Sequence, residues 1–128
     1  MRPQKLDRDE ETELRHILDR VSTRQRETVR LGALLRDWGD LVAKVERGYA
    51  LTLDDYTNDL TVRDTIEEVL EAAGQKLRAK IAIPVGELDR RFMSATVEAD
   101  MPLLPREHHW WTRVPVKRTG DFGVVILK

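Results

Sequence analysis

Five acidic side chains give this sequence its clearest opportunity for chemistry: Asp54, Asp55, Asp59, Glu68 and Glu71. Carboxylate oxygens are the ligands that Mg²⁺ prefers, so these residues could serve a Mg²⁺-dependent enzyme acting on a phosphorylated small molecule. The same acids also suit first helical turns, where they complement the positive end of the helix dipole. Thr52 and Asp55 have the spacing of a capping box, in which each satisfies a backbone N–H of the other. We favour capping, which needs no cofactor, and keep the Mg²⁺ enzyme as the alternative.

Two parts of this acidic set are similar to metal motifs of known enzyme families, and neither motif is complete. The run from Asp54 to Asp59 is similar to the aspartate-rich motif of terpene synthases, whose second metal motif has no counterpart here. Glu68-Val-Leu-Glu71 has the spacing of the first acidic motif of all-α nucleotide pyrophosphohydrolases. The Glu-x-x-Asp motif that should follow it is missing. A solvated acidic helix face therefore remains the favoured interpretation.

Trp110, Trp111 and Arg113 form a second candidate site, for binding rather than catalysis. The stretch 109–116 has the composition of a β-strand, in which successive side chains point to opposite faces. One tryptophan can then join the core while the other stays at least partly outside. Tryptophan and arginine are enriched among interface hot spots, so we expect a protein interface here. Burial of the outer tryptophan beneath residues 102–106 or a helix is the alternative.

Composition argues against several other kinds of site. The chain lacks cysteine, which excludes disulfides, thiolate catalysis and cysteine-ligated zinc. Its three histidines suggest no nucleophile triad, and no glycine-rich turn after a strand resembles a phosphate loop. With 22 basic and 23 acidic residues, the chain also lacks the basic excess of a typical nucleic-acid binder. We expect neither a membrane nor a nucleic-acid partner, and a cytoplasmic location.

The charge is nevertheless distributed unevenly along the chain. Between Tyr49 and Glu71, Arg63 is the single base among seven acids, whereas residues 102–128 carry a basic excess. Segments of opposite charge can pair within the fold or with a partner. Pairing within the fold is the simpler expectation.

Helical periodicity runs through the first three quarters of the chain. One apolar stripe begins at Leu14, and a second, out of phase with the first, begins at Leu31. This phase change predicts two helices, or one helix bent near Ser22. Ser22 and Gln25 have capping-box spacing, which supports a new helix start there. The second helix should end near Gly48. A short helix over 53–59 and a long one over 62–82 should follow, the latter starting at a Thr61/Asp64 capping box and continuing through Gly74.

Pro84 should then cause a break or a kink, because proline biases the preceding residue, Ile83, away from helical angles. A last helix is expected from Val85 to about Thr96. After it we expect a connector over 98–107 and a β-hairpin over 108–128, with strands at 109–116 and 122–127. The predicted core comprises Trp38, Leu41, Leu70, Leu77, Leu88 and Phe92.

These elements predict a mainly α fold: a compact bundle of four to five helices with a C-terminal β-hairpin. The 128 residues suit a single domain, with its helical part over about 8–97. The favoured function is a non-catalytic protein-interaction or regulatory module that binds another protein or a second copy of itself.

Overall fold

The computed structural model describes residues 5–50, 52–99, 103–104 and 108–117. Within these residues lie four α-helices: α1 (Arg8–Gln25), α2 (Leu31–Arg47), α3 (Leu53–Ala72) and α4 (Gln75–Ala95). Two short strands, β1 (Thr96–Glu98) and β2 (Arg113–Pro115), pair in an antiparallel sheet, and a 3₁₀ turn, η1 (His109–Thr112), leads into β2. The predicted helical bundle with a β-hairpin near its C-terminal end is confirmed. No helix of the described ranges is long and apolar enough to cross a membrane.

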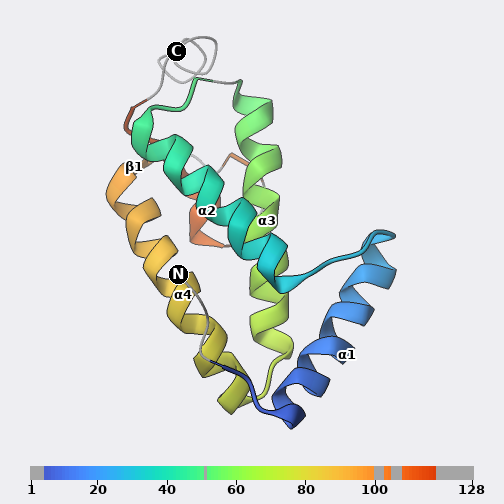
Figure 1. Ribbon diagram of the computed structural model, residues 1–128. Helices are drawn as coiled ribbons and strands as arrows, with labels where there is room; N and C mark the ends of the chain where they lie inside the picture. The colour runs from blue at the N-terminus through green and yellow to red at the C-terminus, as the bar shows by residue number, and fades with distance from the viewer. Residues whose placement is uncertain (1–4, 51, 100–102, 105–107, 118–128) are drawn as a thin grey trace.

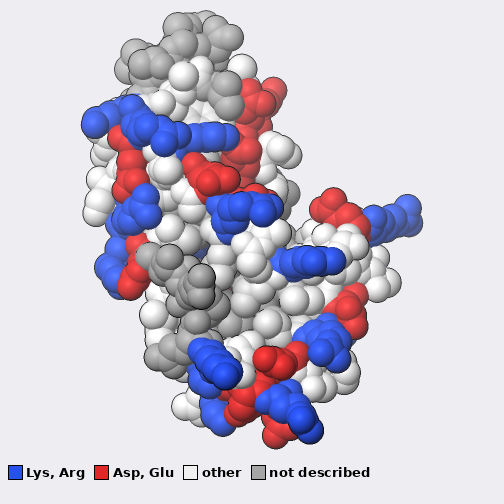
Figure 2. Space-filling view, viewed as in Figure 1, with Lys and Arg blue, Asp and Glu red and all other residues white. Residues whose placement is uncertain are grey.

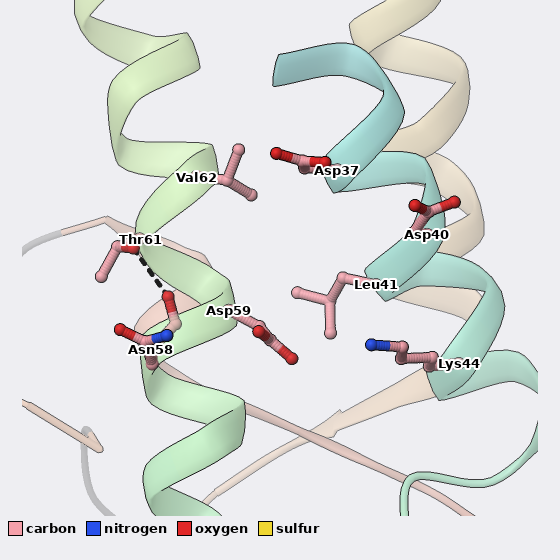
Figure 3. A pocket seen from close by; sticks show the side chains of 8 residues that line it. All are labelled: Asp37, Asp40, Leu41, Lys44, Asn58, Asp59, Thr61 and Val62. Atoms are coloured by element: carbon pink, nitrogen blue, oxygen red, sulfur yellow. Dashed lines mark hydrogen bonds between the residues drawn. The ribbon is translucent and has the colours of Figure 1, made fainter. Parts of the chain in front are cut away.

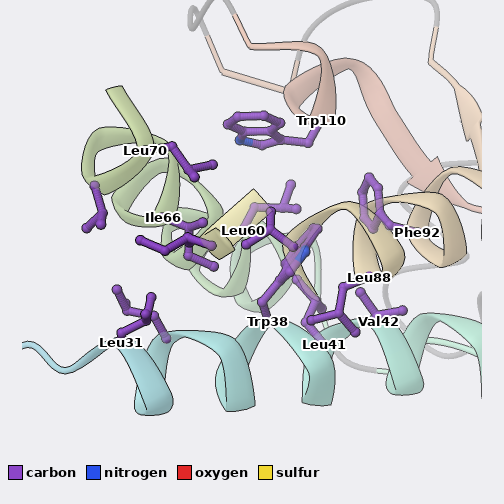
Figure 4. Packing of buried hydrophobic residues seen from close by; sticks show 14 of the residues in the cluster. Leu31, Trp38, Leu41, Val42, Leu60, Ile66, Leu70, Leu88, Phe92 and Trp110 are labelled. Carbon is purple, nitrogen blue, oxygen red and sulfur yellow. The ribbon is translucent and has the colours of Figure 1, made fainter. Parts of the chain in front are cut away.

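Helices α3 and α4 form the centre of the bundle, and the other elements pack on them from different sides. Helix α2 crosses over both. Helix α1 packs against the C-terminal end of α3 and the N-terminal end of α4 (Figure 1). The η1 turn lies on the opposite side of α3 and α4 from α2 (Figure 4). The core therefore receives side chains from both faces of the α3–α4 pair.

All six residues predicted for the core are buried, which confirms the periodicity argument. Trp38 of α2 reaches between α3 and α4, where its ring centroid lies 5.0 Å from that of Phe92 (Figure 4). Trp110 enters the same core from the η1 side. The two tryptophans thus link the outer elements to the central helix pair.

The break between α1 and α2 lies at residues 26–30, so the predicted break at Ser22 is wrong. Helix α1 continues to Gln25 and ends at Arg26, whose φ of 59° is left-handed. The Ser22 hydroxyl accepts from the backbone N–H of Val29 at 2.8 Å, and Gln25 donates to Thr65 on α3. The capping-box spacing is therefore present, but its side chains stabilise the loop after α1 and the contact with α3.

Helix α3 begins at the predicted Thr52/Asp55 capping box, whose two reciprocal bonds are both present. The second predicted box, Thr61/Asp64, is wrong because α3 runs through it without a break. The Thr61 hydroxyl donates to the carbonyl oxygen of Asn58 at 2.7 Å, one turn earlier in the same helix. The short helix and the first part of the long one are therefore a single helix.

The predicted continuation through Gly74 and the predicted break at Pro84 are both wrong. Gly74 caps the start of α4, and its N–H donates to the Glu13 carboxylate of α1 at 2.6 Å. Helix α4 then contains Pro84 in its interior. An interior proline costs about 3 kcal/mol, but burying Ile81, Val85 and Leu88 on one face is worth about 1.5–3 kcal/mol each. Tertiary burial outweighs the local preference.

The predicted hairpin is formed by different segments from those expected. Strand β2 pairs with β1, with Val97 opposite Val114, and residues 109–112 form a 3₁₀ turn in place of the start of a strand. The strand predicted over 122–127 lies outside the described residues. The pairing ties the end of α4 directly to the segment that carries the two tryptophans.

A pair of threonine variants tests the position of the α3 N-terminus. Thr52→Ala should lower the free energy of unfolding by about 1 kcal/mol, because the capping hydroxyl is lost. Thr61→Ala should change it by less than about 0.5 kcal/mol, because this exposed hydroxyl bonds only within its own helix. Urea denaturation measures both values. Equal losses would indicate that a helix starts at each threonine.

Candidate functional site

The tryptophans predicted to form an interface both lie inside the fold. Trp110 is 3% exposed and Trp111 is 0% exposed. Both indole N–H groups donate to the same Asp64 oxygen, at 2.8 and 2.9 Å. The expectation that one tryptophan stays outside is wrong because η1 is a 3₁₀ turn, which does not send successive side chains to opposite faces as a strand does. Trp110 and Trp111 therefore anchor the 108–117 segment to α3.

Arg113, the third predicted interface residue, connects β2 to the end of α4. Its guanidinium donates to the carbonyl oxygens of Met93 and Thr96 at 3.0 and 2.6 Å, and to the Thr96 hydroxyl at 3.0 Å. A cation at a helix C-terminus satisfies carbonyl groups that lack partners within the helix. The contact assigns Arg113 to the same anchoring role.

A buried arginine that the sequence interpretation did not select lies at the centre of these contacts. Arg63 of α3 is 4% exposed. Its guanidinium donates twice to Asp89 of α4, at 3.0 and 2.8 Å, and once to Glu67, at 2.9 Å. It also lies 4.4 Å from the ring centroid of Trp110, in cation–π geometry. Arg63 is the single base of the acidic segment and shares the spacing of the buried leucines Leu60 and Leu70, which is the pattern that could have revealed it.

The surroundings of Arg63 keep its guanidinium protonated. Burial would lower the pKa of Arg63, but the hydrogen bonds and charges of Asp89 and Glu67 outweigh burial and raise it. Asp89 also accepts the indole N–H of Trp38 at 3.0 Å. Both carboxylates beside the arginine are therefore engaged by it. The cluster is suited to holding helices together rather than to moving protons.

Two histidines cover the outer side of this cluster. The His108 ring stacks on Trp110 at a centroid distance of 4.5 Å, and the His109 ring meets Trp110 edge-on at 5.1 Å. Burial lowers the pKa of His109, with Arg63 and Arg113 adding to the effect and Asp89 and Glu67 opposing it. His109 therefore belongs to the folded segment in its neutral form.

The five acids considered for Mg²⁺ are dispersed. Asp55 caps α3, Asp59 accepts from the Tyr49 hydroxyl at 2.8 Å, and Glu68 pairs with Arg24 of α1. Asp54 and Glu71 are exposed. Across the described ranges, no three His, Asp or Glu side chains lie close enough to hold a metal ion. The geometry lends no support to the Mg²⁺ alternative.

The structure instead brings one of these acids, Asp59, together with two others in a groove between α2 and α3, which we call the acidic groove. Its volume is about 290 Å³. Helix α2 contributes Asp37, Asp40, Leu41 and Lys44, and α3 contributes Asn58, Asp59, Thr61 and Val62 (Figure 3). Leu41 and Asp59 point into the space between the helices. On the face where α2 meets the start of α3, carboxylates lie among lysine and arginine side chains (Figure 2).

Two of the four charged groups that line the acidic groove have partners: Asp59 accepts from Tyr49, and Asp37 contacts Arg36. Among the described residues, the exposed side chains of Asp40 and Lys44 have no hydrogen-bond or ion-pair partner. Asp37 has a 3.7 Å contact with Arg36 in which both side chains are well exposed, and such pairs contribute little. Asp37 and Asp40 were not selected from the sequence, because only the packing of α2 on α3 brings them to Asp59.

The chain matches no protein-family model, no curated protein and no solved structure. Its function must therefore be inferred from the groove and the interior contacts.

Removing the buried cation should be far more damaging than removing an exposed one. Arg63→Ala leaves Asp89 and Glu67 without their counter-charge and should lower the free energy of unfolding by about 3–5 kcal/mol. Arg24→Ala, which breaks the exposed pair with Glu68, should cost less than about 1 kcal/mol. Chemical denaturation of both variants gives the comparison. Similar losses would show that the Arg63 cluster does not stabilise the bundle.

His109 should make folding sensitive to mild acid. Because its pKa is lower in the folded than in the unfolded chain, its contribution is complete above the unfolded value of about 6.5 and is lost as the pH falls below that value through the folded pKa. His109→Gln should therefore lose less stability than the wild type between pH 7.5 and pH 5.5 in urea titrations. His16→Gln, on exposed surface of α1, is the control for removing a histidine elsewhere in the chain. An unchanged pH dependence in His109→Gln would contradict this assignment.

Proposed function

We propose that the protein is a non-catalytic interaction module that binds a basic segment of a partner protein in the acidic groove. The observation that carries the proposal is the composition of the groove, in which three carboxylates and one ammonium surround Leu41 and Val62. Lysine and arginine lay their aliphatic stems on apolar surface while their charged ends stay in water. A basic segment could therefore contact the groove floor and pair with the carboxylates together.

A non-catalytic role fits the state of the interior polar groups. A general base must be free to take a proton from a bound substrate. Arg63 engages Asp89 and Glu67, and the two indoles engage Asp64, so these carboxylates serve the fold. The free carboxylates of the acidic groove are exposed, which suits charge recognition.

The sign of the groove favours a different protein over a second copy as the partner. In a two-fold dimer each copy presents the same patch to the other. Pairing two acidic grooves would place carboxylates against carboxylates, and like charges across an interface oppose association. A basic partner removes this repulsion and gains from long-range attraction.

A basic peptide tests the proposal directly. Oligolysine should bind the full chain, and the Asp37→Asn/Asp40→Asn double variant should bind it about 2- to 30-fold more weakly, since each exposed ion pair is worth about 0.2–1 kcal/mol. Titration calorimetry at low and high salt measures the affinity. Binding should weaken with added salt, because exposed charges are screened.

A charge-matched variant separates the groove from net charge. Glu27→Gln/Glu98→Gln removes two exposed carboxylates outside the groove and should bind oligolysine like the wild type. If both double variants lose the same affinity, the acidic groove is not the binding surface. Absence of oligolysine binding to the wild type would also reject the proposal.

A further inference from the structure

The acidic groove is connected to the 108–117 segment through two buried tyrosines. Asp59, the carboxylate that points between α2 and α3, accepts from the Tyr49 hydroxyl at 2.8 Å. Tyr49 is 1% exposed, and burial together with the hydrogen bond to Asp59 strongly raises its pKa. The hydroxyl therefore keeps its proton and remains a donor. Tyr49 thus fixes the orientation of one oxygen of Asp59 within the groove.

The same tyrosine is bound to the C-terminal side of β2. It follows Gly48, which ends α2 with a φ of 119°, and its backbone N–H donates to the Lys117 carbonyl oxygen at 2.9 Å. Its ring meets the Tyr56 ring edge-on at a centroid distance of 5.2 Å. The hydroxyl of Tyr56, which is fully buried, donates to the Arg113 carbonyl oxygen at 2.8 Å. The tyrosine pair therefore holds both ends of the 113–117 stretch.

We propose that the Tyr49–Tyr56 pair couples occupation of the acidic groove to docking of the 108–117 segment on the bundle. The inference rests on the proposed function, since it concerns the regulation of the same groove. A displaced segment would release Lys117 from Tyr49 and Arg113 from Tyr56, and Asp59 would lose its fixed orientation. By thermodynamic reciprocity, a ligand that favours the fixed orientation of Asp59 must strengthen docking of the segment by the same factor.

Tyr56→Phe is the sharpest variant, because it removes one hydroxyl from the segment contact and leaves the ring and the groove lining intact. Oligolysine should bind this variant about fivefold more weakly than the wild type, at the lower end of typical coupling between sites. Tyr49→Phe should show a loss of similar size. In the Tyr49→Phe background, Tyr56→Phe should add little, since the effect passes through Tyr49.

Thr65→Val provides the matched control. It removes another buried hydroxyl of α3, the one bonded to Gln25 of α1, without touching the tyrosine pair. Its oligolysine affinity should equal that of the wild type. A separate measurement needs no variant: saturating oligolysine should slow hydrogen exchange of the Tyr49 amide, which is bonded to Lys117.

The outcomes separate the two proposals. If oligolysine binds the wild type, Tyr56→Phe and Thr65→Val equally and leaves the Tyr49 amide unprotected, the coupling is rejected and the binding function stands. Equal weakening in Tyr56→Phe and Thr65→Val would attribute the effect to general destabilisation and also reject the coupling. Failure of the wild type to bind oligolysine rejects both. Selective weakening in the tyrosine variants, with added protection of the Tyr49 amide, is the expected result.

Discussion

The guanidinium of Arg63 is a positive charge held inside the bundle, and contacts that link α3 to α4, α2 and η1 meet around it. An unpaired buried charge is costly, so its partners must arrive together and with good geometry. Asp89 of α4 accepts from the Arg63 guanidinium and from the indole N–H of Trp38, so it links both α4 and α2 to the arginine. Trp110 brings the η1 turn against the arginine. The Arg63 side chain of α3 thus fixes where α2, α4 and η1 pack against this helix.

This requirement explains why the 108–117 segment packs on the bundle. A two-stranded hairpin alone is marginal in water. Besides the pairing of β1 with β2, the segment is held by the Trp110 and Trp111 indoles on Asp64, by the Arg113 guanidinium on the end of α4, and by the Tyr56 hydroxyl on the Arg113 carbonyl oxygen. The contacts named here between this segment and α3 are hydrogen bonds that involve aromatic side chains rather than the ion pairs that charge alone suggested.

Helical character, the six core residues and the Thr52/Asp55 cap could be predicted because periodicity and capping depend on nearby residues. The continuity of α1 through Ser22 and of α4 through Pro84 could not be predicted. Both local preferences for a break are worth only a few kcal/mol, and the burial around these residues is worth more. Gly74 illustrates the same limit, since its partner is Glu13 on another helix. The acidic groove escaped prediction for a related reason: its carboxylates come from two helices, and their proximity exists only after α2 packs on α3.

The acids of α3 show how one acidic segment can serve both stability and recognition. Glu67 and Asp64 face the interior side of the helix, where Arg63 and two indoles satisfy them and leave them little capacity for a ligand. Asp59 faces α2, where Tyr49 orients it. Of the neighbouring carboxylates, Asp37 has a weak contact with Arg36, and Asp40 has no partner among the described residues. Carboxylates that only stabilise the fold need cations to balance their charge. In the interior this cation is Arg63, which pairs with Asp89 and Glu67. In the acidic groove Lys44 is the single cation among the described lining residues and faces three carboxylates, and the proposed basic segment would supply the further positive charge.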